Sequence, residues 1–229
     1  MRKLGDTDVL NKTIALRVDL NVPVKDGKVL DDTRILASIP TLQYLQKQNS
    51  KIVLISHFGR PEAGIFDSKF SLLPVAKRLA EILNMEIPLF ASTDEVDFNA
   101  DISLLENIRF LSGELTNELD LSRKLSDLAD VYVFDAFGTS HRPHASTYGA
   151  IQAAHSACSG FLLEAETRAL RKATDSKESP TLSIVGGSKV SSKLEVIKSL
   201  IKISEEVLTG GGITNTFLKA QGNNRNFTL

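Results

Sequence analysis

Four arginines stand at, or just beyond, places where short apolar runs end. The segments SHFGRP, ENIRF and HRPHAS contain Arg60, Arg109 and Arg142, and Arg34 opens a helical pattern. Guanidinium groups keep their charge in proteins, so a cluster of them cannot relieve its repulsion by losing protons. Such a cluster calls for an anion, because the guanidinium fork matches two oxygens of a carboxylate or phosphate at once. A lone arginine is more often a surface residue or half of an ion pair, but the four together indicate an anion site.

Polar residues of other types accompany these arginines. Asp19 and Asn21, in RVDLNVP, could bind hydroxyl groups, so the whole set suggests a small polyhydroxy acid that carries a phosphate. The histidines of the same segments, His57, His141 and His144, raise the alternative of zinc. The sequence disfavours zinc, because no cysteine or carboxylate ligands stand at a metal-binding spacing beside them.

A second phosphate-type signal lies in the last quarter of the chain, in VGGSKVSSK (185–193) and TGGGITNTF (209–217). Glycines after a strand let backbone N–H groups approach a phosphate, and the following helix adds its positive end. Lys189 and Lys193 are four residues apart and can share one helix face. The alternative is an ordinary pair of strand-to-helix turns. The sequence has neither a Walker A motif nor the DFG and HRD motifs of protein kinases.

Strands and helices that could position these residues alternate along the chain. Apolar, β-branched runs predict strands at residues 14–18, 51–56, 87–90, 102–105, 131–134, 182–185 and 207–209. Helical patterns cover residues 72–83, 119–128, 162–172 and 190–203, with another helix after the glycines at 210–212. A further helix runs from Asp31 or Asp32 to about Gln48, with a kink or a late start at Pro40.

This alternation predicts parallel sheets with helices on both faces and ligands at the carboxyl ends of the strands. The polar stretch TDSKESP, residues 174–180, lacks periodicity and is the predicted domain boundary. The expected fold class is therefore α/β. A Rossmann-like parallel-sheet domain at 1–173 is followed by a hinge and an incomplete second α/β domain at 174–229.

Composition excludes several other classes of protein. Among 229 residues, 42% are hydrophobic, and 27 basic residues face 28 acidic ones, so nucleic acid is not an expected partner. The single cysteine, Cys158, excludes an internal disulfide and suits the reducing cytosol. The chain opens without a signal peptide, and no apolar run reaches the roughly 18 residues of a membrane span. A cytoplasmic protein without a membrane partner is expected.

Taken in order, these motifs resemble those of the phosphoglycerate kinases, with the bacterial members nearest. The matching segments are RVDLNVPVKDGKVLDDTRI, SHFGRP, FSLLPVAKRLAEIL, LLENIRF, GEL, DVYVFDAFGTSHRPHAST, GFLLEAE, IVGGSKVSSKLEVI and GGGITNTFLKAQG. They are collinear and cover nearly all of residues 14–222. The resemblance implies reversible phosphoryl transfer in glycolysis between ATP and the carboxylate of 3-phosphoglycerate, giving ADP and 1,3-bisphosphoglycerate, with Mg²⁺. It also implies a complete enzyme that is a monomer.

The resemblance assigns the substrate side to the first domain. Asp19 and Asn21 match residues at the carboxyl and hydroxyl end of the acid. The positions that match the substrate loop and the phosphate-binding basic patch are His57, Phe58, Gly59, Arg60, Arg109 and Arg142. Two catalytic cations are implied on the phosphoryl group in transit, Arg34 and Lys189. The nucleotide side is implied to include Lys193, Gly211 and Gly212, and no metal ligand is expected within this chain.

The chain also departs from the family pattern. Phe58 stands where leucine is common, and Pro143 follows Arg142 where a small residue is common. The sequence ends in RNFTL, where the family continues into the adenine pocket and the acidic Mg²⁺ ligand, so this chain alone is expected to be an inactive, truncated kinase. One alternative is a non-catalytic phosphoglycerate-binding module that associates with another chain. Another is an unrelated phosphate-binding α/β protein, for which all the collinear motifs would have to be coincidence.

Overall fold

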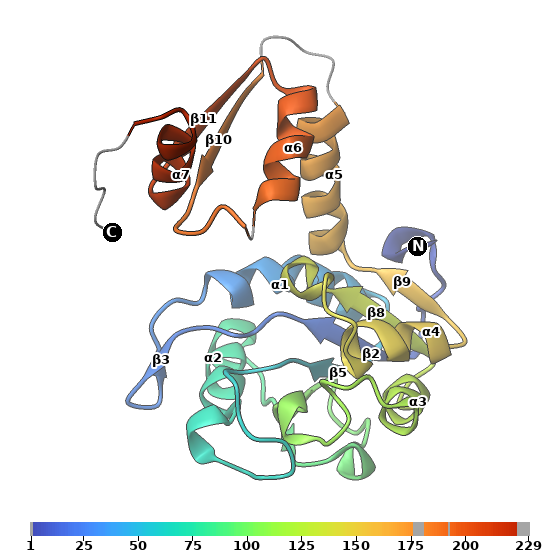
Figure 1. The fold of residues 1–229 in the computed structure, drawn as a ribbon. Coiled ribbons are helices and arrows are strands. Elements are labelled where there is room, and N and C mark those ends of the chain that lie inside the picture. The colour runs from blue at the N-terminus through green and yellow to red at the C-terminus, as the bar shows by residue number, and fades with distance from the viewer. Residues whose placement is uncertain (1, 176–180, 192, 224–229) are drawn as a thin grey trace. The chain divides into compact units, whose positions relative to one another are not determined.

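The computed structural model of the chain describes residues 2–175, 181–191 and 193–223 (Figure 1). The chain divides into two compact units, Met1–Thr167 and Arg168–Leu229, and helix α5 (Phe161–Asp175) crosses this division. The predicted domain boundary begins at residue 174, near the end of α5, and residues 176–180 of the predicted linker lie outside the described residues. That boundary therefore stays a prediction.

In the described part of the first unit, seven strands form one sheet in the order β1-β9-β8-β2-β5-β7-β6. All neighbouring strands are parallel. The strands are β1 (Arg2–Lys3), β2 (Thr13–Val18), β5 (Lys51–Ile55), β6 (Leu89–Phe90), β7 (Ile102–Leu105), β8 (Val131–Asp135) and β9 (Ala157–Ser159). The chain builds outward from β2 to β5 and β7, then returns to place β8 on the other side of β2. A topological switch point therefore lies between β2 and β8, where open α/β sheets bind ligands.

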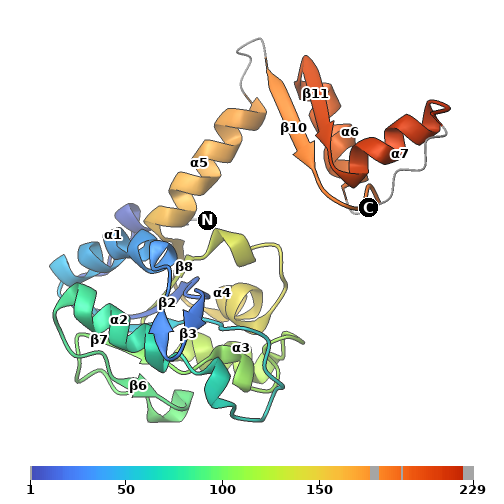
Figure 2. The ribbon, with the colours of Figure 1, turned by 90° about the vertical axis from the view of Figure 1, so that its left-hand side faces the viewer.

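Helices cover both faces of this sheet, as predicted (Figures 1 and 2). Helices α1 (Thr33–Lys47) and α2 (Leu73–Leu83) pack on one face, in a core that contains Leu16 and Leu54 of the central strands. Helices α3 (Leu119–Asp127) and α4 (Ala150–Ala153) pack on the other face, against Ala15 and Tyr132. Because side chains alternate along a strand, each central strand is buried on both faces and forms an almost continuous apolar run.

The start of α1 differs in part from the prediction. The helix begins at Thr33, ahead of Pro40, so the alternative of a late start is wrong and a kink stays a prediction. Asp31 Oδ1 accepts the Thr33 N–H at 2.9 Å and the Thr33 hydroxyl at 2.6 Å. Asp32 instead accepts two N–H groups of Arg78, at 2.6 and 3.0 Å, which joins the start of α1 to α2.

Other short elements complete the first unit. Strands β3 (Val24–Lys25) and β4 (Lys28–Val29) form a hairpin about the predicted turn, where Asp26 and Gly27 have positive φ angles. The sequence analysis did not predict β1, β9 or α4. It also did not predict the single π-helical turn Ala145–Gly149, which follows the basic HRPHAS segment.

The carboxyl end of β8 anchors α5 through a buried carboxyl group. Asp135 is completely buried; its Oδ1 accepts the Leu163 N–H at 2.8 Å, and its Oδ2 accepts the Thr41 hydroxyl at 2.6 Å. Burial raises the pKa of Asp135, and these hydrogen bonds oppose that shift. Gly160 leaves the space for this contact, because a Cβ atom there would lie 2.5 Å from Asp135 Cβ.

The described part of the second unit contains two parallel strands, β10 (Leu182–Gly186) and β11 (Glu206–Gly210), with helices α6 (Leu194–Ile203) and α7 (Gly212–Ala220). Helix α6 begins at Leu194 rather than at residue 190. Val185, Ile197 and Ile213 form the small core of the second unit. Side chains on the other face of the strands are largely exposed, among them Ile184 at 74%.

We predict that Gly160→Ala lowers the free energy of unfolding of the first unit by about 2 kcal/mol or more, because the methyl group must displace Asp135 from α5. Thermal unfolding followed by circular dichroism measures this loss. Gly5→Ala is the matched control, since its Cβ meets nothing within 4 Å, and it should change stability by less than about 0.5 kcal/mol. Equal melting temperatures for the two variants would contradict this packing.

Candidate anion-binding site

The predicted substrate residues of the first unit lie beyond the carboxyl ends of neighbouring strands or at the start of α1. Asp19 and Asn21 follow β2, and the His57–Arg60 loop follows β5. Arg109 lies in a short 3-10 helix after β7, Arg142 lies in the loop after β8, and Arg34 is the second residue of α1. These strands are adjacent and parallel, so their ends meet at one edge of the sheet.

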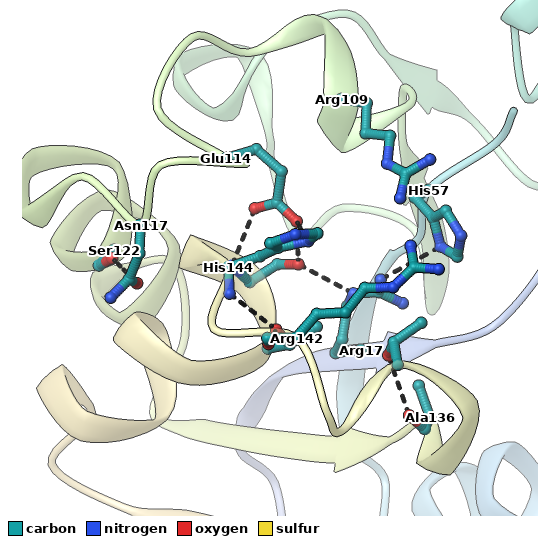
Figure 3. Close-up of polar contacts among 12 residues, drawn as sticks. Arg17, His57, Arg109, Glu114, Asn117, Ser122, Ala136, Arg142 and His144 are labelled. Atoms are coloured by element: carbon teal, nitrogen blue, oxygen red, sulfur yellow. Dashed lines mark hydrogen bonds and ion pairs between the residues drawn. The ribbon is translucent and has the colours of Figure 1, made fainter. Parts of the chain in front are cut away.

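A fifth arginine, which sequence reasoning missed, lies beneath this edge. Arg17 is in β2 and only 1% exposed. Its Nε donates to Ser146 Oγ at 3.0 Å, and its Nη1 donates to the Val18 carbonyl. Its Nη2 lies 3.3 Å from His57 Nδ1 (Figure 3). A charged residue inside the apolar run IALRV was the signal in the sequence, since charges are rarely buried without partners.

His57 is neutral in this setting. It is 5% exposed, and burial, followed by the charges of Arg17, Arg109, Arg142 and Arg34, lowers its pKa to about 2. Because a guanidinium group can only donate hydrogen bonds, His57 Nδ1 must accept from Arg17. The ring hydrogen therefore sits on Nε2, and His57 can serve an anion as a neutral donor.

Arg109 has a buried donor for which the described residues offer no acceptor. The side chain is 7% exposed and donates to the Gly59 carbonyl, yet its buried Nε has no hydrogen-bond partner among the residues that the structure describes. Burial lowers the pKa of Arg109, and the charges of Arg142, Arg17 and Arg60 act in the same direction. A buried, unpartnered N–H group is uncommon in proteins and here points toward an external acceptor.

Hydrogen bonds hold the loop after β5 in one conformation. Asn107 accepts the Phe58 N–H at 3.0 Å and donates to the carbonyls of Phe58 and Phe70 at 2.7 and 2.9 Å. Asn21 Oδ1 accepts the Gly59 N–H at 3.0 Å. Gly59 has a φ of 57°, and a Cβ atom there would lie 2.6 Å from Phe70 Cε1, so only glycine fits. The Phe58 side chain belongs to the core, and its part in binding stays a prediction.

Arg34 is held less tightly than the buried Arg17 and Arg109. Its Nη1 lies 2.8 Å from Asp19 Oδ2, with side-chain exposures of 53% and 19%. Asp19 Oδ1 also accepts the Asn21 N–H at 3.2 Å. An ion pair this exposed contributes at most about 1 kcal/mol, so Arg34 can exchange Asp19 for another anion at little cost.

The loop after β8 is braced from below by Glu114, the second residue that sequence reasoning missed. Glu114 is 1% exposed and accepts the Ser146 N–H at 2.9 Å and the Ser146 hydroxyl at 2.7 Å (Figure 3). His144 Nδ1 lies 3.9 Å from Glu114 Oε1. Burial lowers the pKa of His144, and the charge of Glu114 opposes this shift. No sequence pattern marks the glutamate of GEL as buried.

In the second unit, the two glycine loops meet at the carboxyl ends of β10 and β11. Gly211 has a φ of 63°, and a Cβ atom on Gly212 would lie 2.5 Å from the Ser188 carbonyl oxygen. The Lys193 side chain lies over the first loop, with Cε 3.1 Å from a Cβ built on Gly187. Lys189 is exposed in the same loop. The loops therefore pack with their backbones in contact, which a side chain at Gly212 would prevent.

A parallel sheet with helices on both faces, and with buried cationic side chains at one edge, defines an α/β protein of the Rossmann-like class. Comparison with known sequences and structures places the chain more narrowly. It belongs to the phosphoglycerate kinase family, whose sequence model, described as "Phosphoglycerate kinase", matches residues 4–227. None of the helices in the described ranges has the length and apolar character of a bilayer-spanning segment.

Individual relatives agree with this family. Phosphoglycerate kinase of Desulfovibrio desulfuricans is 47% identical over 221 residues, which are 96% of this chain and 57% of the relative. That of Francisella tularensis subsp. novicida is 51% identical over 222 residues, which are 96% of this chain and 56% of the relative. The solved phosphoglycerate kinase of Coxiella burnetii matches with a TM-score of 0.89 at 41% identity, over 96% of this chain and 57% of that one. The chain thus spans little more than half the length of these relatives.

Acid should destabilise the first unit partly through His57. Its pKa in the folded state is about 2 against an ordinary 6.5, so below pH 6.5 the unfolded chain takes up a proton that the folded chain does not. Stability should therefore fall as the pH drops from 6.5 toward 2. His57→Asn should reduce this slope by about 1.4 kcal/mol per pH unit between pH 6 and 5, measured by urea unfolding. The exposed His155→Asn variant is the control, and identical slopes for all three proteins would rule out a buried neutral His57.

Proposed function

We propose that this chain carries the 3-phosphoglycerate-binding side of a phosphoglycerate kinase. The complete reaction would be reversible phosphoryl transfer between ATP and the carboxylate of 3-phosphoglycerate. The observation that carries this proposal is the buried cationic cluster with the unpartnered Nε–H of Arg109. Family membership supports the same substrate, since the relatives are phosphoglycerate kinases. The alternative of a non-catalytic binding module is not favoured by these comparisons.

The two ends of the acid match the two kinds of arginine in the site. The phosphate would bind where His57 and Arg109 are buried, with the charges of the exposed Arg60 and the half-buried Arg142 beside them. The carboxylate and hydroxyl group would lie toward Asp19, Asn21 and Arg34. There the exposed Asp19–Arg34 pair can open, so that the arginine turns to the substrate.

The proposed reaction needs no covalent intermediate on the protein. The carboxylate oxygen forms a bond to the γ-phosphorus of ATP while the bond to the bridging oxygen breaks, and ADP leaves. A carboxylate is already deprotonated near neutral pH, so no general base is needed. Positioning and charge stabilisation therefore supply the catalysis. We assign that stabilisation on this chain to Arg34 and Lys189, by the family resemblance.

The second unit would bind part of the nucleotide. Its packed glycine loops, with Lys193 over the first of them, fit the approach of backbone N–H groups to phosphates. Gly211 and Gly212 are assigned to the nucleotide on the same ground. Mg²⁺ would neutralise the nucleotide phosphates. Among the described residues no group of three His, Cys, Asp or Glu side chains could hold a metal ion, so we assign none to Mg²⁺. We further propose that the complete enzyme is a cytoplasmic monomer without nucleic-acid or membrane partners.

Arg109→Ala should weaken binding of 3-phosphoglycerate at least ten-fold, because it removes a buried cation whose Nε–H awaits an acceptor. Isothermal titration calorimetry on the purified chain measures this affinity. Arg123→Ala, on the exposed face of α3, removes the same charge elsewhere and should leave the affinity unchanged. Equal affinities for wild type and Arg109→Ala would place the phosphate somewhere other than this cluster.

The 229-residue chain by itself should bind the acid without phosphorylating it. Besides the end of α5, the described part of its second unit has two strands and two helices, and the chain spans 57% of a relative's length. This chain would therefore supply only part of the contacts to the nucleotide. A coupled assay of ATP-dependent phosphorylation of 3-phosphoglycerate tests this expectation. Turnover above the enzyme-free background would show that these 229 residues suffice for catalysis.

A further inference from the structure

Glu114 is a buried carboxylate at the back of the cationic cluster. It is 1% exposed, and its three oxygens hold the start of the π-helical turn from below. Oε1 accepts the Ser146 hydroxyl at 2.7 Å, Oε2 accepts the Ser146 N–H at 2.9 Å, and the main-chain oxygen accepts the Ala145 N–H at 2.9 Å. Arg142 lies a few residues ahead of this turn, so the loop that carries it is braced by Glu114.

Ser146 links Glu114 to Arg17 by hydrogen bonds. Its Oγ accepts Arg17 Nε–H at 3.0 Å, and Arg17 Nη2 lies 3.3 Å from His57 Nδ1 (Figure 3). The Tyr132 hydroxyl donates to the Ser146 carbonyl at 2.6 Å and fixes the same residue from another side. Glu114, Ser146, Arg17 and His57 therefore form one buried chain of hydrogen bonds behind the anion site.

The charge of Glu114 also acts on three groups in and beside the cluster, Arg17, Arg109 and His144. Burial lowers the pKa values of Arg17, Arg109 and His144, and at each of them the carboxylate of Glu114 opposes the effect of burial. The same negative charge stabilises the cations in the empty site and repels an incoming anion. The hydrogen bonds of Glu114 should therefore strengthen anion binding, and its negative charge should weaken it.

We propose that Glu114 is a positioning residue that also sets the affinity of the anion site. It holds Ser146 and Arg17 in place, and its carboxylate lowers the net positive charge of the cationic cluster by one. This inference rests on the proposed function for the identity of the ligand, but it does not depend on the kinase reaction. A glutamate that merely stabilised the fold would not make binding respond separately to its shape and to its charge.

Two substitutions at this position separate the two effects. In Glu114→Gln, the amide oxygen can accept the Ser146 N–H while the amide NH₂ donates to Ser146 Oγ, which still accepts from Arg17. The geometry is kept and the charge is lost. Anion binding should therefore tighten about three- to ten-fold, and the melting temperature of the empty protein should fall by about 5 °C or more. Glu114→Ala removes the brace as well, and binding should weaken about ten-fold or more.

The experiment is calorimetric titration of each folded variant with inorganic phosphate and with 3-phosphoglycerate, at one fixed low ionic strength. Glu86→Gln, an exposed site with the same change in charge, is the control and should match the wild type. Unchanged or weaker binding by Glu114→Gln would overturn the proposal, and so would unchanged binding by Glu114→Ala. If Glu114→Gln does not fold, Ser146→Ala, which cuts the link to Arg17 and keeps the charge, should weaken binding about five-fold, and unchanged binding would overturn the proposal.

The two ligands separate this inference from the proposed function. If the wild-type chain binds 3-phosphoglycerate no more tightly than inorganic phosphate, the assigned substrate is wrong. The phosphate titrations would still test Glu114 in that case. If neither ligand binds to the wild type, both proposals fail together.

Discussion

The repulsion among cationic groups that share one edge of the sheet is the constraint on which the rest of the first unit depends. Two of these groups, Arg17 and Arg109, are almost fully buried, where repulsion is strongest because water screens it least. The parallel strands β2, β5, β7 and β8 bring them together, and the side chains of Asn107 and Glu114 hold the loops by accepting backbone N–H groups. A bound phosphate would reduce this repulsion among the cationic side chains.

The site combines a rigid part with an exchangeable part. His57 and Arg109 are set in loops whose backbone groups are hydrogen-bonded, so little ordering remains to be done when an anion arrives. Arg34 instead sits in a half-exposed pair with Asp19, which can be broken cheaply. A ligand with a phosphate at one end and a carboxylate at the other would use both parts. This division would let one edge of the sheet be preformed for the proposed substrate and still keep a movable cation for the proposed reaction.

Much of the framework could be predicted from the sequence. The strands that carry the site were expected close to their observed ranges, because strands buried on both faces are unbroken apolar runs with polar residues directly after them. Strands β1 and β9 are too short to show any periodicity. Arg17 was missed because, within IALRV, its side chain was counted as part of a strand rather than of the site. Glu114 was missed because its role depends on a contact with Ser146, which lies 32 positions away in the chain.

The proposal that this cationic cluster is a preformed phosphate site can be tested atom by atom in the folded chain. With ¹⁵N labelling, NMR spectra recorded during titration with 3-phosphoglycerate would follow the Nε–H signals of the arginines and the ring nitrogens of His57. We expect the Arg109 Nε–H signal to move downfield on saturation as it gains an acceptor, with His57 remaining neutral and protonated on Nε2. Saturation of the chain with 3-phosphoglycerate that leaves the Arg109 Nε–H signal unmoved would contradict the location of the phosphate in this cluster.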